Sequence, residues 1–226
     1  MFRFDQTKKK YVFISARVHP AEVAASHVMR GLLQFLLDRN DQRAKIARDN
    51  YVFCIVPMLN PDGVYRGHFR TDSLGQNLNR YYVNPSLIEQ PTIYATKNLI
   101  MSLHAAGKLY FYLDLHAHAS KRGCFVYGNS LDYRQQLQSR IFPKLLALNS
   151  PIFEYDSCSF SDSNLKVIEK GQLENKEGAG RVAVHKATHI AYCYTLECNY
   201  NAGSIRNKLT DPTPNLITDE EGISGL

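Results

Sequence analysis

Residues 11–22 have the sequence Y-V-F-I-S-A-R-V-H-P-A-E, and this stretch decides the fold. Its first six residues are aromatic, aliphatic or small, which predicts a short buried strand. Pro20 is tolerated in the first turn of a helix, and apolar residues then recur at helical spacing from Ala21 to Leu37. The stretch therefore predicts a strand followed by a helix, with His19 delivered at the carboxyl end of the strand.

Similar elements follow along the chain. Apolar, β-rich runs predict four more strands, at Tyr51–Met58, Tyr110–Leu115, Cys124–Tyr127 and Tyr192–Leu196. Helical spacing predicts two more helices, at Thr92–His104 and Arg134–Leu148. Polar composition predicts a turn at 60–63, a long loop at 67–82 and a mobile surface loop at 157–180. The alternation of strands and helices predicts an α/β sandwich.

Length and composition favour one domain that neither crosses nor binds a membrane. A chain of 226 residues usually forms a single domain. No apolar run approaches the roughly 18 residues needed to cross a bilayer. Residues 1–10 lack the apolar core and the cleavage site of a secretory signal. The cysteines are odd in number and form no C-x-x-C pair, which predicts reduced cysteines in an intracellular protein: Cys54, Cys124, Cys158, Cys193 and Cys198.

The net charge of +6 is spread along the chain. A positive surface attracts polyanions over long distances, so the charge would suit nucleic acid or an acidic polypeptide. Dispersed charge is also common on any solvated surface, so composition alone selects no partner.

His19 and Glu22 are candidates for metal ligands. They lie three residues apart at a strand-to-helix junction, where an imidazole and a carboxylate can converge on one ion. Nitrogen and oxygen ligands suit zinc, and a catalytic zinc site needs three protein ligands, for which two histidines and one glutamate are an established set. H-x-x-E alone is more often an exposed polar pair on a helix. A second histidine must therefore come from elsewhere.

That histidine lies in D-L-H-A-H at 114–118, which ends an apolar strand. Polar groups at the carboxyl ends of strands in an open α/β sheet line the usual binding crevice. His116 is the first choice as ligand, while His118 could contact substrate, and either could be an ordinary hydrogen-bonded residue. Asp114 faces the same side as His116 by the two-residue strand period, so it could orient the ligand from behind.

Five motifs occur together in this chain: H-P-A-E at 19–22, N-P-D-G at 60–63, N-L-N-R at 77–80, D-L-H-A-H at 114–118 and T-L-E at 195–197. In this combination the chain resembles the zinc metallocarboxypeptidases, and among them the cytosolic carboxypeptidases. The resemblance spans residues 11–203. It implies a three-layer metallocarboxypeptidase-like fold, in which helices flank a mixed twisted sheet, and one zinc ion per chain held by His19, Glu22 and His116.

The resemblance also implies roles for other residues. Glu197 would be the general base, and a nearby carboxylate is suited to that work because zinc lowers the pKa of bound water towards about 7. Arg80, preceded by Asn79, would grip the terminal carboxylate of the substrate through a bidentate fork. Arg70 would stabilise the developing oxyanion. These roles make the expected enzyme an exopeptidase.

The substrate class follows from the subfamily. Its members shorten polyglutamate side chains on tubulin, and some remove the branch-point glutamate. We therefore expect a cytoplasmic monomer, with microtubules or the nucleus as further locations, that acts on glutamylated tubulin tails or other acidic proteins rather than on nucleic acid. On the sign of charge alone, Lys176 or Arg181 could meet the glutamate side chain, and His118 could contact substrate.

The chain departs from the family pattern in several places. Ala21 and Ala117 stand where relatives usually carry glycine, and His185 stands where close relatives carry tyrosine. The catalytic domain is expected over residues 1–210, without the amino-terminal β-domain and carboxyl-terminal helix of the family, and residues 211–226 are expected to form a polar tail. Two alternatives therefore remain, a zinc amidohydrolase of the aspartoacylase kind and an inactive, truncated tubulin-interaction module.

Overall fold

One mixed sheet of five strands, in the order β2-β1-β3-β7-β4, forms the centre of the chain. The computed structural model describes residues 9–161, 166–169, 172–200, 203 and 205–207. Four strands run parallel, and β4 at one edge is antiparallel to β7. The strands are β1 (Lys10–Ala16), β2 (Tyr51–Val56), β3 (Leu109–His118), β4 (Cys124–Tyr127) and β7 (Cys193–Asn199).

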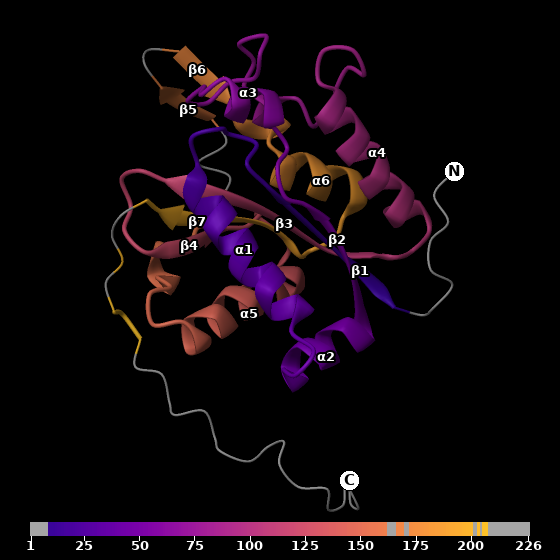
Figure 1. Cartoon of the computed structure of the whole chain (residues 1–226), viewed down its shortest axis with the longest axis vertical. Helices are drawn as coiled ribbons and strands as arrows, with labels where there is room; N and C mark the ends of the chain where they lie inside the picture. The colour runs from indigo at the N-terminus through magenta and orange to yellow at the C-terminus, as the bar shows by residue number, and fades with distance from the viewer. Residues whose placement is uncertain (1–8, 162–165, 170–171, 201–202, 204, 208–226) are drawn as a thin grey trace, which may run out of the picture.

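Helices cover both faces of this sheet (Figure 1). The layer on one face contains α1 and α5, with α2 beside α1, and the layer on the other face contains α4 and α6. The bounds are α1 (Val23–Leu37), α2 (Gln42–Asn50), α4 (Pro91–Ala105), α5 (Tyr133–Asn149) and α6 (Gly180–Thr188). This arrangement confirms the predicted α/β fold. None of the described helices combines the length and apolar character that a membrane span requires.

Alternating side chains of the strands supply the two cores. On β1, Ile14 and Ala16 pack with α1, while Tyr11 and Phe13 pack with α4. Successive residues of a strand point to opposite faces, so a strand covered on both sides must be apolar throughout. This explains why the run at residues 11–16 shows no polar alternation.

Several elements differ from the predicted bounds. The first helix begins at Val23, because His19 to Glu22 form the turn that leads into it. N-P-D-G at 60–63 begins a short helix, α3 (Pro61–Tyr65), instead of a simple turn. The Oδ1 of Asn60 accepts a hydrogen bond from the Gly63 N–H at 2.9 Å, which caps this helix. Strand β3 continues through His118, so His116 lies within the strand and not beyond it.

The sequence analysis missed helices α2 and α6 and a hairpin within the predicted loop. The polar helix α2 has no wide apolar face, and its main signal is Asp41, whose carboxylate accepts from the Arg43 and Ala44 N–H groups. The predicted loop at 157–180 contains an antiparallel hairpin of β5 (Lys166–Glu169) and β6 (Gln172–Asn175), so it was wrong as a loop over these residues. The short helices η1 (Leu78–Arg80), η2 (Tyr155–Ser157) and η4 (Lys176–Gly178) complete the described elements. The predicted tail at 211–226 lies outside the described residues.

Candidate functional site

The carboxyl ends of β1, β3 and β7 bring the polar residues of the site together. Ser15 on β1 pairs in register with Asp114 on β3, and His116 on β3 pairs with Glu197 on β7. Neighbouring strands lie about 4.8 Å apart, and residues in register project to the same face of a sheet. The register therefore places Glu197 beside His116.

A tight turn after β1 delivers His19. Arg17 adopts a left-handed backbone conformation with φ of 59°, which is uncommon for a residue with a side chain. Its buried guanidinium donates to the Pro20 carbonyl oxygen at 2.7 Å and to the Ser26 hydroxyl at 2.7 Å. These bonds hold the turn, so His19 and Glu22 face the ends of the strands.

His19, Glu22 and His116 form a buried cluster with the geometry of a metal site. Their relative exposures are 3%, 7% and 3%. One ligand atom from each lies within 4.8 Å of the other two. The Nδ1 atoms of the two imidazoles face the same carboxylate, His19 at 2.7 Å from Oε1 of Glu22 and His116 at 3.0 Å from Oε2.

The outer nitrogen of each imidazole is held by a different kind of group. Nε2 of His116 lies 2.8 Å from Oδ2 of Asp114, whose Oδ1 accepts from the Ser15 hydroxyl at 2.8 Å. Nε2 of His19 lies 3.0 Å from Oδ1 of Asn77. Such bonds leave the lone pair on Nδ1 for a metal and fix the ring. The predicted orienting role of Asp114 agrees with this contact.

Burial and mutual charge set the protonation of the cluster. Burial would raise the pKa of Glu22, but His116 and His19 outweigh it and hold the pKa well below its ordinary value. Burial lowers the pKa of His19. Burial would also lower the pKa of His116, but Asp114 and Glu22 raise it well above its ordinary value. A divalent cation could take the place of the proton that His116 shares with these carboxylates. The donor set of two imidazoles and one carboxylate therefore fits zinc.

Glu197 is the residue next to this cluster without a satisfied carboxylate. Its Oε2 is shielded from solvent and has no hydrogen-bond partner among the described residues. Burial raises the pKa of its carboxyl to about 7, and the carboxylates of Glu22 and Asp114 act in the same direction. A carboxyl group with a pKa near neutrality can both accept and return a proton.

Two of the predicted cationic residues, Arg70 and Arg80, make different contacts. Nη1 of Arg70 is 3.8 Å from Oε1 of Glu22, and 41% of its side chain is exposed, so it borders the cluster and faces solvent. Arg80 lies on η1, where its Nη1 donates to the carbonyl oxygen of Asn79 at 3.0 Å. Asn79 is buried, and its Oδ1 accepts from the Gly180 N–H at 2.9 Å. Asn79 thus attaches η1 to the start of α6.

Two further predicted residues lie near the rim of the site. His118 ends β3 half-buried, and its Nδ1 accepts from the Lys121 N–H at 3.2 Å. Burial lowers the pKa of His118, and Lys121 and Lys176 lower it further. Lys176 therefore lies close enough to His118 to act on its charge.

Arg181 and His185 are engaged elsewhere on α6. The guanidinium of Arg181 donates to the Gly128 carbonyl oxygen and, at 2.6 Å, to Oδ1 of Asn129. These contacts tie α6 to the end of β4. His185 lies in the last turn of α6, where its Nδ1 is 3.0 Å from the Ile190 carbonyl oxygen. His185 is thus at the opposite end of α6 from Gly180 and Asn79.

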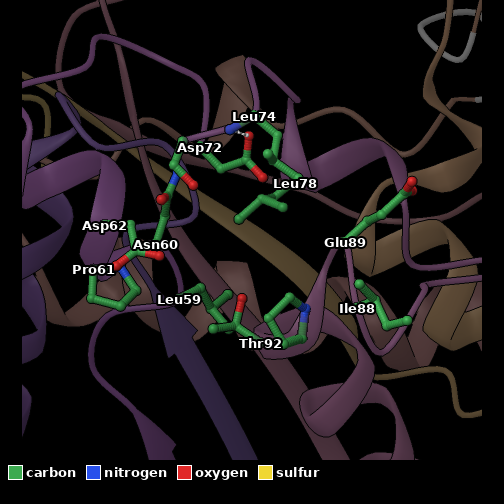
Figure 2. A pocket seen from close by; sticks show the side chains of 12 residues that line it. Leu59, Asn60, Pro61, Asp62, Asp72, Leu74, Leu78, Ile88, Glu89 and Thr92 are labelled. Atoms are coloured by element: carbon green, nitrogen blue, oxygen red, sulfur yellow. Dashed lines mark hydrogen bonds between the residues drawn. The ribbon is translucent and has the colours of Figure 1, made fainter.

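A separate pocket lies beside α3 and the start of α4 (Figure 2). Its described lining contains the carboxylates Asp62, Asp72 and Glu89, apolar side chains such as Leu78 and Ile88, and no lysine or arginine. None of the predicted metal, catalytic or substrate residues lines it. A polyanionic substrate would be repelled here, so the pocket does not extend the candidate site.

Asn77 contacts the metal cluster and was missed by sequence reasoning. Its Oδ1 faces His19 and also accepts from the Asn79 N–H at 3.1 Å, so it joins the metal cluster to η1. The signal was its place in N-L-N-R, two residues before Asn79. Tyr200 was also missed. Burial raises the pKa of its phenol, and the charges of Glu22, Glu197 and Arg70 all act on it.

Comparisons with known proteins agree with this geometry. The family model described as zinc carboxypeptidase matches residues 3–198. The bovine cytosolic carboxypeptidase-like protein 5 is 34% identical over 294 residues, which cover 92% of this chain and 33% of that protein. Human cytosolic carboxypeptidase 6 is 39% identical over 200 residues, which cover 87% of this chain and 38% of that protein. The chain thus spans about a third of the length of these curated relatives.

The solved structures give the same result for the fold. A Shewanella denitrificans protein, assigned as a carboxypeptidase A, superposes with a TM-score of 0.71 and 29% identity. The superposition covers 90% of this chain and 54% of that structure. The sequence match extends over both half-sites and nearly all of the sheet. This chain therefore belongs to the M14 family of zinc carboxypeptidases.

Proposed function

We propose that this chain is a zinc-dependent exopeptidase that releases glutamate from acidic protein tails. The substrates we infer are glutamylated tubulin tails, including the branch-point glutamate, or other acidic proteins. Relatives at 34% and 39% identity are named cytosolic carboxypeptidases. We propose that this chain is a cytoplasmic monomer, with microtubules and the nucleus as further locations.

His19, Glu22 and His116 would hold the zinc, which when bound acidifies a water molecule and polarises the scissile carbonyl. Glu197 takes a proton at Oε2 and returns it to the leaving amine. Arg70 holds a positive charge beside the cluster, where negative charge develops on the carbonyl oxygen.

The unpartnered Oε2 of Glu197 carries the proposal. A carboxylate oxygen that is shielded from solvent and has no partner costs free energy, so folded proteins rarely keep one without a use. In the proposed reaction, Oε2 of Glu197 binds the proton that is transferred during hydrolysis. Register with His116 brings Glu197 beside the cluster.

Positive charge around the site supports an acidic substrate. Arg70, Arg80 and Lys176 are the cations near the site that we assign to the substrate, and the chain has a net charge of +6. Arg80 can grip a terminal carboxylate through two parallel hydrogen bonds. Lys176 then remains for the side-chain carboxylate of the terminal glutamate, and His118 contacts the substrate at the rim.

The test incubates zinc-loaded protein with defined peptides that carry α-linked, γ-linked or branch-point glutamates. Mass spectrometry of the products should show successive losses of single glutamate residues. Chelation should abolish the release and zinc should restore it. Glu197→Gln should keep zinc and lose turnover by roughly 10³-fold or more, since general-base catalysis alone contributes about 10²–10⁴-fold.

Two outcomes would replace the proposal. Preferred cleavage of small N-acyl amino acids would indicate an amidohydrolase of the aspartoacylase kind, which also uses H-x-x-E and a distant histidine. Stoichiometric zinc without turnover of any glutamylated peptide would indicate a tubulin-interaction module.

A further inference from the structure

Two cysteines that the proposed mechanism does not use face each other across β4 and β7. Cys124 and Cys198 are directly opposite in the antiparallel register, and their Sγ atoms are 3.2 Å apart. The Asn199 N–H donates to the Gly123 carbonyl oxygen at 2.9 Å, which makes that neighbouring pair the hydrogen-bonded one. Cys124 and Cys198 therefore occupy a non-hydrogen-bonded position, where opposing side chains approach most closely.

This position satisfies the backbone requirement of a disulfide. Opposed residues at non-hydrogen-bonded positions have Cα atoms about 4.5 Å apart, within the range of roughly 4.4 to 6.8 Å that disulfides span. The sulfur atoms need to approach by only about 1 Å to reach bonding distance. All five cysteines are free thiols in the structure.

The two thiols differ in a way that favours reaction at Cys124. The two sulfurs share a hydrogen bond, and this contact lowers the pKa of the Cys124 thiol and raises that of Cys198. Cys124 is half-buried, so it is open to small reagents, and Lys121 and Arg122 precede it closely. By contrast, burial raises the pKa of the nearby Cys158 thiol to about 11. Thiolates are the reactive form, so Cys124 is the expected nucleophile.

We propose that Cys124 and Cys198 are a modification site, at which a small anionic disulfide such as glutathione disulfide converts the two thiols into a cross-strand disulfide. The Cys124 sulfur attacks the reagent, its S–S bond breaks, and one glutathione thiolate leaves. The Cys198 sulfur then attacks the mixed disulfide at Cys124 and releases the second glutathione. Each cysteine loses one proton and one electron, and the reagent is reduced to two thiols.

The disulfide has a consequence for the active site that depends on the proposed function. Cys198 directly follows Glu197, and Phe125, next to Cys124, pairs with Glu197 across the strands. The new bond ties β4 covalently to β7 beside the residue that moves the proton, so even a small adjustment of either strand is passed to Glu197. A displacement of about 1 Å near the reacting groups can cost on the order of 100-fold. We expect kcat to fall by about 10-fold or more while KM changes little.

The test treats the zinc-loaded full chain with glutathione disulfide, alkylates the remaining thiols and maps tryptic peptides by fragmentation. The expected product links Cys124 to Cys198, has lost two hydrogen atoms and is reversed by dithiothreitol. A glutathione adduct that persists on Cys124, a bond from Cys124 to Cys158, or alkylation of Cys124 and Cys198 at the rate of Cys54 would each overturn the proposal.

Matched variants separate this site from the other cysteines. Cys124→Ala should retain basal turnover and resist the inactivation by glutathione disulfide. Cys54→Ala, on β2 at the opposite edge of the sheet, should be inactivated like the unmodified chain. Mass spectrometry shows whether the disulfide forms even if the protein proves to have no carboxypeptidase activity. Full turnover in the mapped, disulfide-linked form would overturn the link to Glu197.

Discussion

The two halves of the metal cluster are built in different ways. His19 and Glu22 come from one local turn, and the outer nitrogen of His19 meets a neutral amide, Asn77. His116 comes from the middle of the sheet, and its outer nitrogen meets a buried carboxylate, Asp114. A carboxylate makes an imidazole a stronger electron donor than an amide does. His116 on β3 should therefore bind metal more strongly than His19 does. The turn that contains His19 and Glu22 mainly sets the geometry of the site.

The largest expected effect comes from removing either ligand. His19→Ala and His116→Ala each leave two protein ligands, too few for a catalytic zinc site. We expect zinc affinity to fall by more than about 100-fold in both variants, beyond the 10–100-fold typical of changes behind the ligands. Zinc content after dialysis against a weak chelator measures this. Retention of stoichiometric zinc by either variant would refute the three-residue site.

Changes behind the ligands should have smaller and unequal effects. Asp114→Asn should weaken zinc binding by about 10–100-fold, and Asn77→Ala by less, because only the first removes a charge that supports the imidazole. Asn77→Asp should tighten binding by making the two halves alike. Competition with a fluorescent chelator gives the affinities, and Asp62→Asn, an exposed carboxylate outside the cluster, is the control. Equal effects at both positions would contradict the difference between the halves.

The smallest effect is the pH dependence that Glu197 adds to stability. Burial raises the pKa of Glu197 to about 7, so the folded metal-free chain holds a proton that the unfolded chain has released between about pH 4.5 and 7. Its folding free energy should therefore weaken as pH rises through this window. Glu197→Gln removes the titration. Between pH 5 and pH 8, the free energy of unfolding of the variant should rise by roughly 1 to 2 kcal/mol relative to that of the unmodified chain. One pKa unit corresponds to about 1.4 kcal/mol, and the expected gain per unit is smaller because Glu197 is only half-buried.

Urea unfolding of both metal-free proteins at several pH values measures this difference. A gap that stays constant with pH would mean that Glu197 has an ordinary pKa in the folded chain. A gap that closes as pH rises would reverse the sign of the argument.

The sequence predicts one half of the site from a local pattern and the distant His116 from the motif that ends its strand. H-x-x-E lies within four residues, and the apolar run before it predicts the strand that presents it. Cys124–Tyr127 matched its strand because both ends are marked by turn residues. Asn77 was missed because its contact with His19 spans 58 residues and depends on how the loop at 67–82 folds back. The hairpin β5–β6 was missed because its short strands lie in polar sequence.

The sheet register could not be read from the sequence either. Nothing in the two strand sequences states that His116 lies opposite Glu197 rather than one residue away. That alignment follows from packing of alternate side chains on both faces, as with Phe13 and Tyr112, whose rings stack with centroids 5.9 Å apart. The motifs supplied the identities of the residues, and the packed sheet supplies their alignment.

Gly178 has a consequence for how substrate preference could change. A Cβ at Gly178 would overlap the Arg80 carbonyl oxygen, and the Gly178 carbonyl oxygen accepts from the Tyr82 N–H at 3.1 Å. The segment that contains Lys176 therefore packs directly against the backbone of Arg80, the residue proposed to bind the substrate terminus. Grafting either loop from another peptidase would displace the other. A successful exchange of specificity should require both loops to be transplanted as a matched pair.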